Sequence, residues 1–286
     1  MRSKTTSFEK IALLLLMLLA GLFGGVIRLM HLRDGFDTLG LAISGNRSGL
    51  ILLILCVFML VALGAVILLA ATDRLFPQNP VSIGIVGIPT ILFAIFAAIA
   101  ATCGTIVSFA SAIRSVSVWG MLSSLLFFAT AALTVPVVRR LSMPVDGGSP
   151  TASASLVPVF WACFRLIEVY RTVSANPSVS AYFYDIAALI TMILMLFACS
   201  GYLYGRKSAT RVYLSVAANL FFCTLSLVGR GGHALRLLLN GTAVPGSELL
   251  DVLIFLYGFL YTLAVVPLFF APRRRDPMAA LTETDA

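Results

Sequence analysis

Eight long apolar stretches, separated by short polar segments, make up most of the chain. They run over approximately residues 11–30, 50–71, 85–110, 118–138, 155–174, 180–204, 211–230 and 249–270. Each is close to the 20 or so residues that a helix needs to cross the hydrocarbon layer, and none alternates apolar and polar residues like a barrel strand. Because only helices satisfy all of their own backbone hydrogen bonds in lipid, the pattern predicts an all-α, polytopic bundle of about eight transmembrane helices.

The composition places the chain in a lipid bilayer. Hydrophobic residues make up 60% of the 286 residues and charged residues only 11%, whereas a typical soluble domain has about 25% charged residues. We therefore expect one integral membrane domain over residues 1–286. The first apolar stretch follows Arg2 and Lys4, as the core of a secretory signal peptide would. Its apolar run continues to Ile27 without a clear cleavage site, so we interpret it as a retained helix.

The distribution of basic residues predicts the orientation of the bundle. The termini and the even-numbered gaps carry 12 of the 20 Lys and Arg residues, including the clusters at 139–140, 206–207 and 273–275, against eight on the other face. Lys and Arg concentrate on the cytoplasmic side of membrane proteins, so both termini are predicted to be cytoplasmic. The Gly-, Pro- and Ser-rich segment 139–154 is expected to be a flexible cytoplasmic linker, and residues 272–286 a disordered tail.

Pairs of small residues four positions apart predict where helices approach one another closely in lipid. Gly21 and Gly25 form such a pair in the first stretch, and Gly201 and Gly205 form another in the sixth. We interpret these pairs as packing sites within one molecule rather than as a dimer interface. The sequence leaves the oligomeric state open.

One arginine falls inside a stretch that is predicted to cross the hydrocarbon layer, where a charge is unfavourable. Arg165 is near the middle of the fifth stretch, about 13 Å from its outer end at 1.5 Å per residue. An unpaired arginine near the centre of a transmembrane helix costs about 2.5 to 3.5 kcal/mol on insertion scales, so Arg165 must face protein, water or an acid. Trp161 and Glu168 share its helix face, which allows an ion pair with Glu168 and a cation–π contact with Trp161.

Further charged and polar residues enter the outer ends of the last three stretches. They are Tyr182, Asp185, Arg230 and Asp251. In one interpretation Arg165 is neutralised by Glu168 or Asp185, and the charges only fix how the helices pack, as in a membrane scaffold or signalling partner. In the other, which we favour, the charges line an outward-facing cavity among helices five to eight that binds or transports a small polar solute.

Other functions find little support in the sequence. Its two histidines and five cysteines show no metal-ligand spacing, no cofactor motif is present, and the basic residues flank apolar spans rather than forming a nucleic-acid surface. Tyr184-Asp185 matches half of an intramembrane aspartyl protease motif, but the second half is missing, so we do not expect an enzyme. We expect His233 in a surface segment after Gly231-Gly232, and residues 234–240 in a short interfacial helix.

A set of residues between 155 and 230 forms a further pattern: Pro158-Val-Phe-Trp161-Ala-Cys-Phe-Arg165, Asn176-Pro177, Tyr182 with Asp185, and Gly201 with Gly205. In this pattern residues 155–230 resemble a group of polytopic membrane proteins from Gram-positive anaerobic bacteria for which no activity is known. The resemblance implies a multi-pass protein of the bacterial cytoplasmic membrane and implies no substrate.

Overall fold

The computed structural model describes the backbone of residues 2–36, 43, 46–71, 87–141, 150–174, 179–205 and 209–270. Its long helices are α1 (Arg2–Asp34), α2 (Arg47–Ala71), α3 (Ile88–Arg114), α4 (Val118–Leu141), α6 (Leu156–Ser174), α7 (Val179–Leu203), α8 (Ala209–Leu239) and α9 (Gly246–Val265). A short helix, α5 (Pro150–Ala154), and a 3₁₀ turn (Val266–Phe269) complete the described elements. Eight helices are long and apolar enough to cross a membrane, which confirms the prediction of an all-α polytopic bundle.

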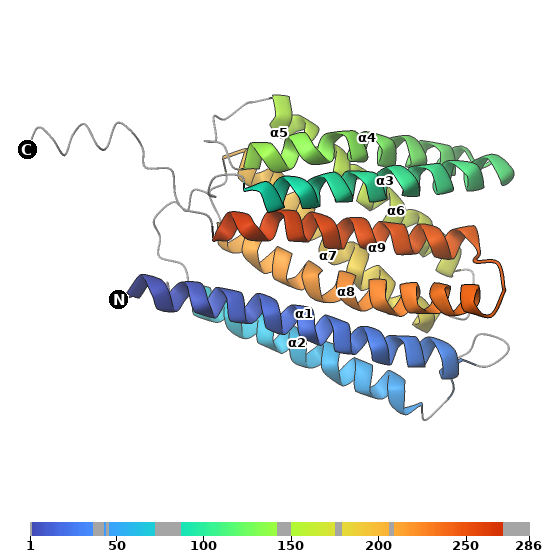
Figure 1. The fold of residues 1–286 in the computed structure, drawn as a ribbon, viewed down its shortest axis with the longest axis horizontal. Helices are drawn as coiled ribbons and strands as arrows, with labels where there is room; N and C mark the ends of the chain where they lie inside the picture. The colour runs from blue at the N-terminus through green and yellow to red at the C-terminus, as the bar shows by residue number, and fades with distance from the viewer. Residues whose placement is uncertain are drawn as a thin grey trace, which may run out of the picture.

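The helices run side by side along the long axis of the molecule, in alternating directions (Figure 1). The α3–α4 and α8–α9 turns lie at one end of the bundle, and α1 begins and α9 ends at the other. We call these the outer end and the inner end, following the orientation that the basic residues predict.

The centre of the bundle is α8, the most deeply buried of the spanning helices. It packs against α1, α7 and α9, while α3 packs against α4 and α9, and α6 lies between α4 and α7. Glycines bring α1 and α8 together: a Cβ at Gly21 would lie 2.9 Å from Thr224 Cβ, and one at Gly25 would lie 2.5 Å from Val228 Cβ. The predicted intramolecular role of Gly21 and Gly25 is therefore confirmed.

The predicted end of the seventh span at Arg230 is wrong. Helix α8 continues through Gly231-Gly232 to Leu239, so residues 234–239 are its last turns rather than a separate interfacial helix. Glycine inside a helix costs only about 1 kcal/mol relative to alanine, which tertiary packing can offset. Here α1 packs so closely that a Cβ at Gly232 would meet Leu29 Cδ2 at 2.9 Å.

The segments predicted to be a linker and a tail are only partly described. Helix α4 extends to Leu141 and α5 begins at Pro150, so part of the 139–154 linker is helical. Residues 142–149 and the predicted tail at 272–286 lie outside the described residues. So do Asn176-Pro177 and the basic clusters at 206–207 and 273–275.

A tight turn joins α3 to α4 at the outer end. Only Ser115, Val116 and Ser117 separate the two helices, and Val116 has φ of 48°. A β-branched residue is rarely found in this left-handed region, because its side chain clashes with the backbone there. The turn places several serines near the outer ends of α6 and α9, where the buried charges lie.

Candidate functional site

Buried charges gather in the outer half of the bundle in two clusters. The first, which we call the Arg165 cluster, joins α6 to α9. Arg165 donates from Nη1 to Glu168 Oε2 at 2.9 Å and from Nη2 to Asp251 Oδ1 at 2.7 Å. The hydroxyl of Ser123 on α4 donates to the same oxygen of Glu168 at 3.4 Å. Only 9% of Arg165 is exposed, so the two acids compensate a charge that is nearly removed from solvent.

The second cluster, the Arg230 cluster, ties four helices together. Arg230 on α8 donates to Asp185 Oδ2 from Nη2 at 2.6 Å and from Nε at 2.9 Å, and to Glu248 Oε2 on α9 at 2.9 Å. Arg28 on α1, which is fully buried, donates to the same Asp185 oxygen at 3.3 Å. His233 lies 3.3 Å from the other oxygen of Glu248. This cluster engages both oxygens of Glu248.

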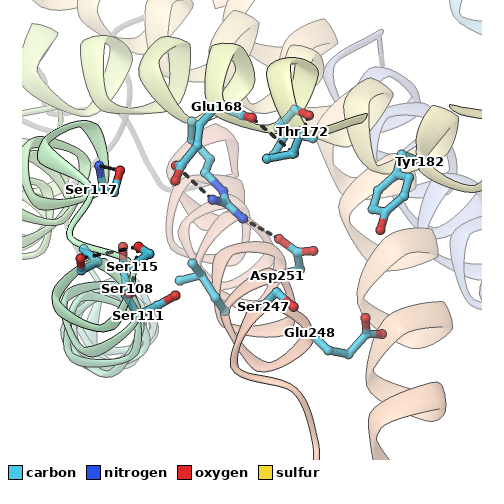
Figure 2. A pocket seen from close by; sticks show the side chains of 15 residues that line it. Ser108, Ser111, Ser115, Ser117, Glu168, Thr172, Tyr182, Ser247, Glu248 and Asp251 are labelled. Carbon is cyan, nitrogen blue, oxygen red and sulfur yellow. Dashed lines mark hydrogen bonds and ion pairs between the residues drawn. The ribbon is translucent and has the colours of Figure 1, made fainter. Parts of the chain in front are cut away.

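A cavity of about 320 Å³ opens beside the Arg165 cluster at the outer end of the bundle. Such a volume lies within the roughly 300 to 1,000 Å³ range of small-molecule sites. Its polar wall is formed by the serines at 108, 111, 115, 117 and 247, by Thr172 and Tyr182, and by Arg165, Glu168, Glu248 and Asp251. Figure 2 shows the serines of the α3–α4 turn on one side and Tyr182 and Glu248 on the other. The cavity can therefore offer hydroxyls and carboxylates to one ligand.

Two carboxylate oxygens on this wall lack partners among the described residues. All contacts of Glu168 go to Oε2, and the contact of Asp251 goes to Oδ1. Glu168 Oε1 and Asp251 Oδ2 thus remain able to accept hydrogen bonds from a ligand or from water. The hydroxyls of Ser111 and Ser247, both exposed, also have no hydrogen-bond partner within the described part of the chain.

Aromatic side chains close the bundle one to two helical turns further inward. Trp161 stacks on Phe127 with ring centroids 4.0 Å apart and an interplanar angle of 3°. The ring of Tyr257 meets both of them edge-on, with centroids 6.0 and 5.6 Å away. All three side chains are almost completely buried and come from α4, α6 and α9. They separate the cavity from the inner half of the bundle.

The structure divides the predicted site residues into two groups. Arg165, Glu168, Asp251 and Tyr182 line the cavity. The remaining three predicted site residues, Trp161, Asp185 and Arg230, are not among the residues that line it.

Two of the predicted contacts of Arg165 are wrong. Asp185 does not neutralise Arg165, because α7 presents it to α1 and α8 instead. Trp161 makes an aromatic stack rather than a cation–π contact with Arg165. Within the described residues, the cation–π contacts place Arg28 4.8 Å from the ring centroid of Tyr184 and Arg230 4.9 Å from that of Tyr182.

Sequence reasoning missed two charged residues of the site. Arg28 directly follows the end of the apolar run at Ile27, but α1 continues six residues beyond it, which buries its side chain against α7 and α8. The apolar Leu29, Met30 and Leu32 that follow Arg28 could have signalled this continuation. Glu248 precedes Asp251 by one helical turn, and that spacing places both acids on one face of α9.

Comparison of the chain with known protein families, with curated proteins and with solved structures gives no match. Among the described residues, no group of three or more His, Cys, Asp or Glu side chains could hold a metal ion.

Proposed function

We propose that this multi-pass membrane protein binds a small polar solute in the outer cavity, and that binding is the first step of moving the solute across the membrane. The observation that carries the proposal is the pair of unpartnered carboxylate oxygens, Glu168 Oε1 and Asp251 Oδ2, on a cavity wall rich in hydroxyls. The side chains of Glu168 and Asp251 are 34% and 17% exposed, so a ligand or water in the cavity can donate hydrogen bonds to these two oxygens.

The charge of the walls favours a solute with a positive group. Arg165 lines the cavity together with three acids, Glu168, Glu248 and Asp251. Arg230 offsets one of them, since it binds Glu248 from outside the cavity. One carboxylate is thus left in excess, and a cationic or amine-bearing solute would balance it, while the serines would bind its hydroxyl groups. Arg165 acts as a fixed charge that holds the two carboxylates in place.

Binding can be tested on the full chain in lipid nanodiscs. We would measure thermal unfolding with a panel of small amines, amino acids and polyols, and then determine the affinity of the best probe. A hydrogen bond to a charged group contributes about 1.5 to 3 kcal/mol, so Asp251→Asn and Glu168→Gln should each weaken binding roughly 10- to 100-fold. Asp34→Asn is the matched control, because Asp34 is exposed at the same end of the bundle. Equal affinity in all three variants would exclude these carboxylates from a binding site.

The alternative is a membrane scaffold or signalling partner that transports nothing. The Arg230 cluster favours it, because this cluster joins α1, α7, α8 and α9 through oppositely charged side chains that pair with one another. In that case the Arg165 cluster would serve the same packing role, and the outer cavity would hold only water.

Cysteine labelling distinguishes the two functions and tests the orientation. In a variant without the five native cysteines, we would introduce Ser247→Cys on the cavity wall or Asp185→Cys in the Arg230 cluster. A membrane-impermeant maleimide added from outside should label position 247 and leave position 185 unlabelled, and the best probe from the binding screen should protect position 247. Labelling without protection by any probe would support the scaffold. Labelling only from the inside would reverse the predicted orientation.

A further inference from the structure

A second cavity, of about 510 Å³, lies in the inner half of the bundle between α2, α7 and α8. Apolar side chains form most of its wall, and those of Leu194 and Phe197 on α7 are each 54% exposed. Because these residues lie on the outward face of a spanning helix, the cavity is a groove that faces the lipid. It is separate from the outer cavity, with which it shares no residue.

Within the part of the chain that the structure describes, no residue closes this groove on the α2 side. Helix α2 packs mainly along α1 and touches α8 only briefly. A Cβ at Gly64, which lines the groove, would meet no atom within 4 Å, in contrast to the close contacts at Gly21 and Gly25. An apolar gap does not hold water, and an empty gap loses dispersion contacts. The groove therefore suits an acyl chain of the surrounding lipid.

A positive charge stands at the inner mouth of the groove. Arg211 is exposed in the first turn of α8. The groove-lining residues Leu214, Ser215 and Ala218 follow it by three, four and seven positions, so all four lie in one stripe along the same face of the helix. The stripe spans about 10 Å, a third of the hydrocarbon thickness of about 30 Å. The groove thus leads from a guanidinium at the membrane surface into the apolar layer.

We infer that this groove binds an anionic phospholipid of the inner leaflet. Arg211 binds the phosphate, because a guanidinium matches two phosphate oxygens and the positive end of the α8 dipole lies beside it. One acyl chain lies along Gly64, Phe197 and Ala218. Basic pockets between helices on the cytoplasmic side commonly bind anionic lipid headgroups. The charge of the groove also selects an anionic lipid over a zwitterionic one.

Native mass spectrometry of the full chain in detergent tests this site. We would compare retention of phosphatidylglycerol with that of phosphatidylcholine carrying the same acyl chains. One basic residue near a membrane surface is worth about 1 kcal/mol, so the wild type should prefer the anionic lipid about fivefold and Arg211→Gln should abolish the preference. The control Arg236→Gln removes the same charge from the exposed outer end of the same helix and should leave the preference unchanged.

A second pair of variants tests the acyl-chain part of the site. Gly64→Phe places a ring in the open space of the groove and should lower retention of both lipids at least threefold. Val61→Phe is its control, since Val61 lies on α2, is 65% exposed and does not line the groove. Equal lipid retention in Gly64→Phe and Val61→Phe would overturn the proposal, as would an equal effect of the two arginine variants. A lipid-free dimer whose contact is broken by Gly64→Phe would overturn it too, because a second copy would then fill the groove.

Discussion

Replacing Asp185 by asparagine should show how strongly buried charge holds this bundle together. Asp185 Oδ2 accepts three hydrogen bonds, two from Arg230 and one from Arg28. The side chains of Arg28 and Arg230 are 0% and 8% exposed, so solvent cannot replace the lost carboxylate. Asparagine keeps the size of the side chain and replaces the charged carboxylate by a neutral amide. The substitution therefore tests electrostatics with little change in packing.

The expected loss follows from the partners that remain. Removing one member of a buried ion pair costs about 3 to 5 kcal/mol, because the other charge stays buried without its counter-charge. Arg230 still has Glu248 at 2.9 Å, and the fully buried Arg28 loses its ion pair with Asp185, so a loss toward the lower end of this range is expected. The double variant Arg28→Met with Asp185→Asn lacks both members of the Arg28–Asp185 ion pair, so its loss should be smaller than the sum of the two single losses.

The free energy of unfolding can be measured by SDS titration in mixed micelles, followed by the fluorescence of the two tryptophans. The control Asp34→Asn breaks an ion pair with Arg33 whose side chains are more than 60% exposed, and it should change the free energy by less than about 0.5 kcal/mol. A loss below about 1 kcal/mol in Asp185→Asn would refute the reasoning. So would a double variant as unstable as the sum of its single substitutions.

Two further predictions concern the backbone. A Cβ at Gly229 would lie 2.4 Å from Arg28 Cγ, whereas one at Gly231 would meet nothing within 4 Å. In the same SDS titration, Gly229→Ala should therefore lower the free energy of unfolding by about 1 to 3 kcal/mol, and Gly231→Ala should raise it by up to about 1 kcal/mol. Equal effects of the two substitutions would contradict the close α1–α8 contact. At the α3–α4 turn, Val116→Gly should raise the free energy of unfolding by about 1 kcal/mol, because glycine relieves the strain of the left-handed backbone. Val116→Ala should not raise it, since alanine keeps the Cβ. A higher free energy of unfolding in Val116→Ala would contradict this explanation.

The local pattern of the chain was enough to predict several features of the site. Because Arg165 lies deep in its span, it was expected to pair with an acid, and Glu168 lies three residues further on the same helix face. The structure shows this ion pair. The same kind of reasoning placed Gly21 and Gly25 at a helix contact. These predictions succeeded because they depend on the helical period and on the cost of charge in lipid, which any single span carries in its own residues.

Partners on different helices could not be assigned in this way. Asp185 and Asp251 enter their helices at the same level, and only the rotation and order of the helices decide that Asp251 meets Arg165 while Asp185 meets Arg28 and Arg230. The extension of α8 through Gly231-Gly232 depends equally on its neighbour, because α1 packs against it there.

Apolar runs, their lengths and the distribution of arginines and lysines by themselves determined an eight-helix membrane protein and its predicted orientation. Tertiary structure alone decided that the charges form two clusters, and that the Arg165 cluster lies on the wall of the outer cavity while the Arg230 cluster reaches that wall through Glu248. The physical reason is that lipid acts on each span separately, through its hydrophobicity. Contacts between spans depend instead on which faces the packed bundle turns toward one another, and no single span contains that information.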